Sequence, residues 1–406
     1  MRCKIYLFVL LVFLFSACSN YMTEQSGFFS KFNRGEYQSA ADSLKTKSEK
    51  EGKDQILYLL DRGTALFEDG EYKEAIEVLT KAERLSEVKD FTSINEEVVS
   101  VITTDTFKKF VPLDYERIMI NVYLAVSYFM LGKYEDALVE CRRINNLVAV
   151  LKDKGMKDFE ESPLAWYISA SIYEMQGKYD HARIDYSRVL AIEPSFEQAA
   201  YDAYRCAVYS NNMYLARDVQ KKYPGLRLSD ALKGRCKDCG DVLVLYSYGQ
   251  IPIKRQSRYN SMLPEFHTRT HSDGNLSVYG DGGLLLGSGD VVLNLEDVAR
   301  RNLAERINRI MAKRLLGVGT KVAIGYGVAK ATKNEGLGIL TGLLLQAATV
   351  PDTRGWSTLP KDFRIARIRL PKGPNTIDIR SQGASVLKKE INIEPKDLQI
   401  IPVRCD

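Results

Sequence analysis

The amino-acid sequence lacks the motifs of nucleotide-dependent and hydrolytic enzymes. It contains no G-x-x-x-x-G-K-[ST] phosphate loop and no G-x-S-x-G nucleophile elbow. The glycines of 317–319 and 325–327 lack the remainder of a dinucleotide-binding fingerprint. Histidine occurs only 3 times. We therefore expect a protein without enzymatic activity or cofactor, although a carboxylate pair for glycoside cleavage would leave no motif, because folding sets such pairs.

A strong charge of either sign is also missing. The formal net charge is +5, from 57 basic and 52 acidic residues. This balance argues against a nucleic-acid partner, which would require a strongly basic surface. The 45% hydrophobic and 27% charged content is that of an ordinary globular protein. A length of 406 residues allows two or three domains.

No apolar run is long enough to span a membrane, which takes about 20 residues. Residues 336–350 are uncharged, and Gly338 and Gly342 form the small-xxx-small pair typical of helices that associate in lipid. Because the run is short, it favours a buried helix that packs closely against a neighbour.

The N-terminus has the three parts of a secretory signal peptide. Its start is positively charged, residues 5–15 are apolar, and two small residues precede Cys18. This arrangement resembles the bacterial lipobox, although Phe15 stands where the lipobox usually has leucine. The resemblance implies cleavage before Cys18, a diacylglycerol on its sulfur and an acylated amino terminus, and so a stable membrane anchor. The alternative is an ordinary signal peptide followed by a chance cysteine.

Five further cysteines would remain in the mature chain: Cys141, Cys206, Cys236, Cys239 and Cys405. An odd number in an exported chain means at least one free thiol or an intermolecular disulfide. Cys236 and Cys239 could join His267 and His271 as four zinc ligands, but the gap between the two pairs is longer than in a zinc finger. We therefore expect no metal site, and either a local disulfide or free thiols at Cys236 and Cys239.

The pattern Gly-x-Tyr-x-x-Ala recurs along the first half of the chain. Copies begin at Gly35, Gly70, Gly132 and Gly177, and a degenerate copy lies at 211–216. They resemble the tetratricopeptide repeat, a helix–turn–helix unit of about 34 residues. The glycine ends the first helix, where a left-handed residue is needed. Because such arrays form concave surfaces for extended partners, we expect protein partners in the repeat groove.

Two inserts, at about 91–114 and 151–162, interrupt the regular repeat spacing. Inserts in a repeat array emerge as loops or extra helices. They could lie beside the binding face, or they could only brace the superhelix.

The second half has the pattern of an α+β domain. Residues 242–246 read as a buried strand, and 295–315 as an amphipathic helix after an N-cap at Asn294. The basic polar face of this helix could meet anionic lipid or an acidic partner, or it could simply face solvent. In the β-rich tail, a change in the phase of alternation at 365–366 predicts a bulge. The segment 391–401 reads as a hairpin.

The combined features resemble a family of uncharacterised bacterial lipoproteins, in which tetratricopeptide repeats precede a β-containing domain. Residues 352–360, leading into 366–371, are the most specific stretch, and 114–123 is a second. The resemblance implies the outer membrane, and more weakly a link to cell-wall synthesis. It supplies no catalytic residue. Ser19, rather than aspartate, after Cys18 also favours the outer membrane.

Within the most specific stretch, Asp352, Arg354 and Trp356 are candidate functional residues. They could bind a ligand. Alternatively, Asp352 and Arg354 could pair across a turn while Trp356 covers the core, since a tryptophan beside a β-domain usually packs.

Together these features predict a multi-domain chain that is α and then α+β. We expect a signal peptide at 1–17, a lipidated tether at 18–26, helical repeats at 27–225, and an α+β domain ending in a small β-module at 240–406. The predicted function is a lipid-anchored, periplasm-facing scaffold of the outer membrane that binds protein partners in cell-envelope assembly. The alternative is an envelope enzyme or glycan-binding protein with its site in the C-terminal domain.

Overall fold

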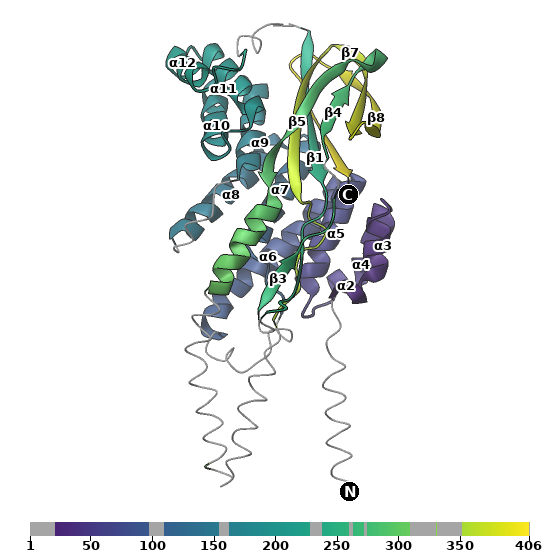
Figure 1. The fold of residues 1–406 in the computed structure, drawn as a ribbon. Coiled ribbons are helices and arrows are strands. Elements are labelled where there is room, and N and C mark those ends of the chain that lie inside the picture. The colour runs from purple at the N-terminus through teal and green to yellow at the C-terminus, as the bar shows by residue number, and fades with distance from the viewer. Residues whose placement is uncertain are drawn as a thin grey trace.

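The computed structural model describes residues 21–96, 109–153, 162–227, 238–259, 263–271, 274–308, 330 and 351–405. Figure 1 shows how their helices and strands are arranged. The predicted lipid-attachment residue Cys18, the cysteine Cys236 and the uncharged run 336–350 lie outside the described residues. Within the described ranges, no helix is long and apolar enough to cross a bilayer.

Paired helices make up the first half of the chain. They are α2 (Tyr21–Glu24), α3 (Ser26–Phe32), α4 (Tyr37–Glu49), α5 (Gln55–Asp69), α6 (Tyr72–Glu96), α7 (Asp114–Met130), α8 (Tyr134–Asp153), α9 (Pro163–Met175), α10 (Tyr179–Ile192), α11 (Glu197–Tyr209) and α12 (Met213–Lys222). The motif glycine stands between the helices of each pair with a positive φ, for example 88° at Gly70 and 72° at Gly177. Small residues allow the close packing, because a Cβ on Gly63 would overlap the side chain of Leu79. The predicted helical repeats are confirmed.

Residues 21–26 were expected to belong to the lipidated tether at 18–26, but they pack against the repeats. Helix α2 begins at Tyr21, whose side chain is buried and whose hydroxyl donates to Asp61 Oδ2 at 2.9 Å. The tether prediction is therefore wrong for residues 21–26. An aromatic ring anchored on a buried carboxylate holds this segment against the repeats.

The second half contains one large sheet and one small one. The strands are β1 (Cys239–Tyr248), β2 (Ile253–Gln256), β3 (Pro264–His267), β4 (Leu276–Tyr279), β5 (Leu285–Asn294), β6 (Asp362–Pro371), β7 (Gly373–Ser381), β8 (Ala384–Ile393) and β9 (Leu398–Cys405). The large sheet has the order β8-β7-β4-β5-β6-β1-β9, and β2 pairs with β3 separately. Strands β1 and β9 are parallel, and the remaining pairs are antiparallel. Figure 1 shows the sheet lying along the repeat helices.

The two faces of strand β6 meet different surroundings. Phe363 and Ile365 join the apolar core of the repeat helices. Ala366 and Ile368 point to the opposite face and join a second core, which the sheet encloses with side chains of β1, β4, β7, β8 and β9. Both faces of β6 are buried, so apolar residues stand on each face. The alternation of apolar and polar residues changes phase at 365–366 because the charged Arg367 follows Ile365 on the face that meets the repeat helices.

The bulge predicted in β6 is therefore wrong. This strand pairs with β1 in continuous register from Asp362 to Pro371. The irregularity lies in the neighbouring strand β5, between Val291 and Leu293.

The predicted hairpin at 391–401 is also wrong. Strands β8 and β9 stand at opposite ends of the sheet order, and β8 forms its hairpin with β7. The turn between them crosses the start of β1, where Asp241 N donates to Asp397 O at 2.9 Å. Two strands joined by a short polar turn look alike in sequence whether the turn makes a hairpin or connects the two edges of a curled sheet.

A helix at residues 295–308 directly follows β5. Asn294 caps it as predicted, because Asn294 Oδ1 accepts from Asp297 N at 3.1 Å. On its polar side, Arg300 pairs with Glu296 at 2.7 Å, so part of the basic surface is satisfied within the helix. The predicted continuation to residue 315 lies outside the described residues.

Candidate functional site

The three signature residues lie where the C-terminal domain enters the repeat array. Arg354 donates to Asp352 through Nε at 2.9 Å and Nη2 at 2.7 Å. Its Nη1 reaches the N-cap residue that precedes helix α5, donating to Asp54 Oδ1 at 2.7 Å. The pairing of Asp352 and Arg354 across a turn is as expected. The third contact, to a residue in the repeat half, left no signal in the sequence.

Trp356 is 1% exposed and packs between repeat helices. Its indole N–H donates to Thr64 Oγ1 at 2.9 Å and Thr358 Oγ1 at 3.0 Å, and its ring lies 5.6 Å from that of Tyr123. Its backbone N–H donates to Glu116 Oε1 at 2.8 Å. Of the two alternatives for Trp356, its side chain packs in the core, and this core belongs mainly to α5 and α7.

Glu116 joins the two stretches that carry the family resemblance. While Oε1 accepts from Trp356, Oε2 accepts from Leu113 N at 2.6 Å, so the same carboxylate caps helix α7. Glu116 is fully buried. The specific residues around 114–117 and 352–360 therefore form one contact, between segments distant in the chain.

Asp61 connects a third segment to this contact. It accepts from Thr358 at 2.8 Å and from Tyr21 at 2.9 Å, and it is fully buried. Burial raises the pKa of Asp61 to about 7, although both hydroxyl donors act in the opposite direction. A single acidic group thus links the N-terminal helix, the repeats and the C-terminal domain.

Farther along the array, a buried ionic cluster joins the sheet to the last repeats. Arg367 of β6 pairs with Glu174 at 2.9 Å, Asp202 at 3.5 Å and Asp241, while Arg205 pairs with Glu174 and Asp202 at 2.7 Å each. Burial works to raise the pKa of Glu174, but Arg205 and Arg367 together lower it to about 2. Glu174 thus stays ionised beside these two guanidinium groups.

These contacts cover the groove in which a partner was expected. Successive first helices, α5, α7, α9 and α11, all supply side chains to the C-terminal domain. Because the signature residues bond within the chain and Arg354 and Trp356 are buried, they do not form the open cleft that an enzymatic or glycan-binding site would need. Sequence reasoning missed Asp61 and Arg367, although Arg367 lies in the specific stretch 366–371.

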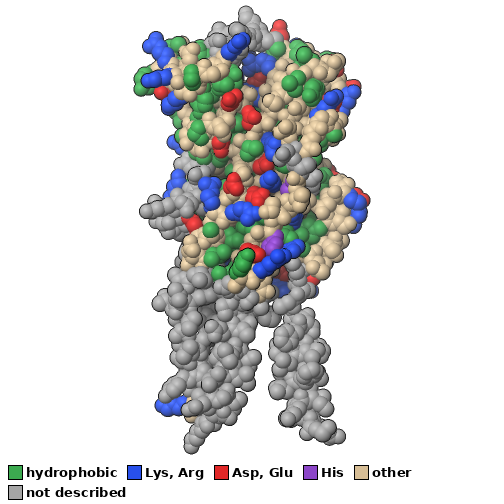
Figure 2. All heavy atoms as spheres, in the orientation of Figure 1, with side chains coloured by type: hydrophobic (Ala, Val, Ile, Leu, Met, Phe, Trp, Pro, Cys, Tyr) green, Lys and Arg blue, Asp and Glu red, His purple; other side chains and the backbone are tan. Residues whose placement is uncertain are grey.

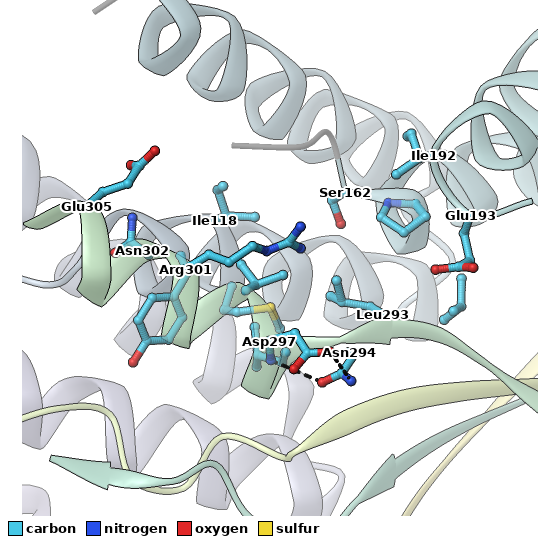
Figure 3. A pocket seen from close by; sticks show the side chains of 16 residues that line it. Ile118, Ser162, Ile192, Glu193, Leu293, Asn294, Asp297, Arg301, Asn302 and Glu305 are labelled. Atoms are coloured by element: carbon cyan, nitrogen blue, oxygen red, sulfur yellow. Dashed lines mark hydrogen bonds between the residues drawn. The ribbon is translucent and has the colours of Figure 1, made fainter. Parts of the chain in front are cut away.

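A separate pocket of about 220 Å³ lies beside this junction. Figure 3 shows that α7, the start of α9, the end of α10 and the helix at 295–308 surround it. Apolar side chains such as Ile118, Leu293 and Ile192 form part of its wall, and Asn302 and Glu305 stand at one end. None of these residues was predicted as a site. The sequence feature that could have indicated this pocket is Asn302, a polar residue among the apolar positions of its helix.

Cys239 and His271 are not brought together as zinc ligands. Cys239 is disulfide-bonded, and Cys236, with which either a local disulfide or free thiols were expected, lies outside the described residues. His271 contacts Tyr248, at the opposite end of the ten-residue strand β1. Ten strand residues span about 30 Å, far beyond metal-ligand distances. Among the described residues, no group of three His, Cys, Asp or Glu side chains could hold a metal ion.

One face of the molecule carries charged side chains of both signs. On the face in Figure 2, basic and acidic groups alternate across the repeats and the C-terminal domain. That face therefore presents small regions of either sign rather than one charged surface.

The comparisons with known proteins concern the repeats. Residues 164–196, within α9 and α10 and the following turn, match the tetratricopeptide repeat family. Similar solved structures include MamA from Desulfovibrio magneticus RS-1, at 13% identity over 54% of this chain and 99% of that chain, with a TM-score of 0.35. A tetratricopeptide repeat protein from Parabacteroides merdae shows 20% identity over 52% of this chain and 68% of that chain, with a TM-score of 0.34. No curated protein matches the chain.

The family match and the paired helices agree. Four motif glycines with positive φ separate the helices of successive pairs, and a fifth pair turns at Asn211. The chain consists of a tetratricopeptide-type helical region followed by a strand-rich domain. Arrays of this type serve as surfaces for protein–protein interaction.

Proposed function

We propose that the protein is a lipid-anchored scaffold of the bacterial cell envelope that binds protein partners and catalyses no reaction. The repeat array is the observation that carries the binding role, because helix pairs of this kind present surfaces to other proteins. The lipobox-like sequence before Cys18 supports the anchor and the outer-membrane location.

The internal contacts refine this proposal. Since the C-terminal domain covers the first helices of the repeats, a partner must bind elsewhere or displace that domain. The outer surfaces of the repeats and the junction pocket remain open to a partner.

Lipid labelling tests the anchor. We expect wild-type protein to carry lipid and to fractionate with the outer membrane, and Cys18→Ser to lose both properties. Cys3→Ser is the matched control, because this cysteine lies within the predicted signal peptide and should be dispensable. An unlabelled wild type recovered in the soluble fraction would contradict the anchor.

Partner capture tests the scaffold role. After crosslinking in intact cells, the mature protein should return a reproducible set of envelope proteins from solubilised membranes. Capture of no protein above the level of an unrelated lipoprotein would contradict a scaffold function.

A further inference from the structure

The junction pocket contains a buried polar side chain that the fold does not use. Asn302 is 3% exposed and lies on the apolar side of its helix, beside Leu303 and one turn from Ala299. Neither Nδ2 nor Oδ1 has a hydrogen-bond partner among the described residues. An unpaired buried amide destabilises a fold, so stability alone would favour leucine at this position.

Glu305 adds a second unused group, one turn farther along the same helix. Its Oε2 is buried and accepts no hydrogen bond from the described residues. In Figure 3 the side chains of Asn302 and Glu305 stand together at one end of the pocket. The pocket thus offers an amide, which both donates and accepts, beside a carboxylate, which accepts only.

The remaining lining defines what could occupy the pocket. Asp297 and Glu193 add two further carboxylates against the single guanidinium of Arg301, so the charge complements a cation. Ile118 and Leu293 contribute an apolar wall. At about 220 Å³ the pocket is smaller than the roughly 300–1,000 Å³ of typical ligand and cofactor sites, and it suits a side chain with its peptide unit.

We propose that this pocket binds an extended segment of a partner protein that carries an apolar side chain next to a lysine or arginine. The Asn302 amide pairs with the C=O and N–H of the partner backbone, the apolar side chain lies against Ile118 and Leu293, and the basic group meets Glu305. This inference rests on the proposed scaffold function and assigns it a recognition site. Because both halves of the chain line the pocket, it forms only when the C-terminal domain is docked on the repeats.

Selection from a random peptide library tests the site. Peptides displayed on phage are selected on the mature full-length protein, synthesised with a fluorophore and titrated by anisotropy. We expect enrichment of an apolar residue adjacent to lysine or arginine. Asn302→Leu should weaken binding about tenfold or more, while its melting temperature stays equal or rises, because the unpaired amide is removed.

Charge is tested separately with Glu305→Gln, which keeps the shape of the side chain. Its binding should weaken, and the loss of affinity at high salt should become smaller than in wild type. Matched controls are Asn146→Leu on helix α8 and Glu390→Gln on strand β8, both exposed and outside the pocket. Both controls should bind like wild type.

Several results would overturn the assignment. These are failure to enrich any peptide, enrichment of acidic peptides, peptide affinity for Asn302→Leu within twofold of wild type, or a lower melting temperature of that variant. If Asn302→Leu still captures the wild-type set of envelope proteins, the pocket is not the recognition site but the scaffold function stands. If wild type itself captures none, the scaffold function fails.

Discussion

Asp61 ties three distant segments together through one carboxyl group. It accepts hydrogen bonds from Tyr21 and Thr358 and is completely buried in helix α5. Burial raises its pKa from an ordinary value near 3.8 to about 7. The folded protein therefore holds a proton that the unfolded chain releases between these two values.

The raised pKa of Asp61 predicts how stability depends on pH. Between about pH 4 and pH 7 the folded state binds more protons at Asp61, so its contribution to the free energy of unfolding falls as pH rises. A tenfold difference in proton affinity between the two states corresponds to about 1.4 kcal/mol. We expect Asp61→Asn, which resembles the protonated acid, to remove a decline of a few kcal/mol across this range, as measured by urea unfolding at several pH values.

Asp69→Asn is the control for this measurement. Asp69 is exposed at the end of the same helix, so its replacement should leave the pH dependence of the wild type unchanged. Equal pH profiles for wild type and Asp61→Asn would show that Asp61 titrates normally in the fold.

At the scale of elements, strand β6 shows that a sequence pattern can identify a strand without identifying what each face of the strand packs against. Its alternation was readable, and a strand lies where expected, at Asp362–Pro371. However, the sequence does not state that Phe363 faces repeat helices while Ile368 faces a second core. In the sequence, Arg367 was recognised only as part of the specific stretch 366–371. Its role could not be predicted, because its partners Glu174 and Asp202 come from the repeat half.

Replacing Arg367 tests how β6 is held on the repeats. Arg367→Met should leave Glu174, Asp202 and Asp241 with fewer buried positive neighbours. Breaking a buried ion pair from one side costs about 3–5 kcal/mol, and we expect a loss of this order in denaturant unfolding.

Arg380→Met on β7 provides the comparison. Its side chain is 35% exposed and pairs with Asp378, so its loss should cost only about 0–1 kcal/mol. If both arginine variants lose equally little stability, the buried cluster does not hold the sheet on the repeats.

At the scale of the whole molecule, the sequence established the two halves but not their relation. The repeats and the α+β character were local patterns, and the Asp352–Arg354 turn lies within three residues. The contacts from Arg354 to Asp54 and from Trp356 to Thr64 join positions about 300 residues apart. No local pattern in the sequence pairs such residues, so the covered groove and the junction pocket became visible only in the fold.

The covered groove changes how the molecule should unfold. Repeat arrays are stabilised by neighbour contacts and can lose structure from one end. Here one continuous apolar core includes repeat residues such as Tyr123 and Tyr167 together with Leu243, Ile365 and Trp356. We therefore expect the wild type to unfold in a single calorimetric transition, because the sheet braces several repeats at once.

Trp356→Ala tests this coupling between the halves. It removes a large buried side chain and its indole hydrogen bonds, at a cost of about 3–5 kcal/mol. Because the loss is concentrated at the junction, we expect the single transition to separate into two. Trp166, which is then the only tryptophan, reports unfolding of the repeat half by its fluorescence.

Tyr259→Ala is the control. This side chain is 98% exposed, so its replacement should change neither the calorimetric transition nor the tryptophan fluorescence. A single, merely shifted transition in Trp356→Ala would mean that the remaining contacts, including the Arg367 cluster, are sufficient to couple the halves.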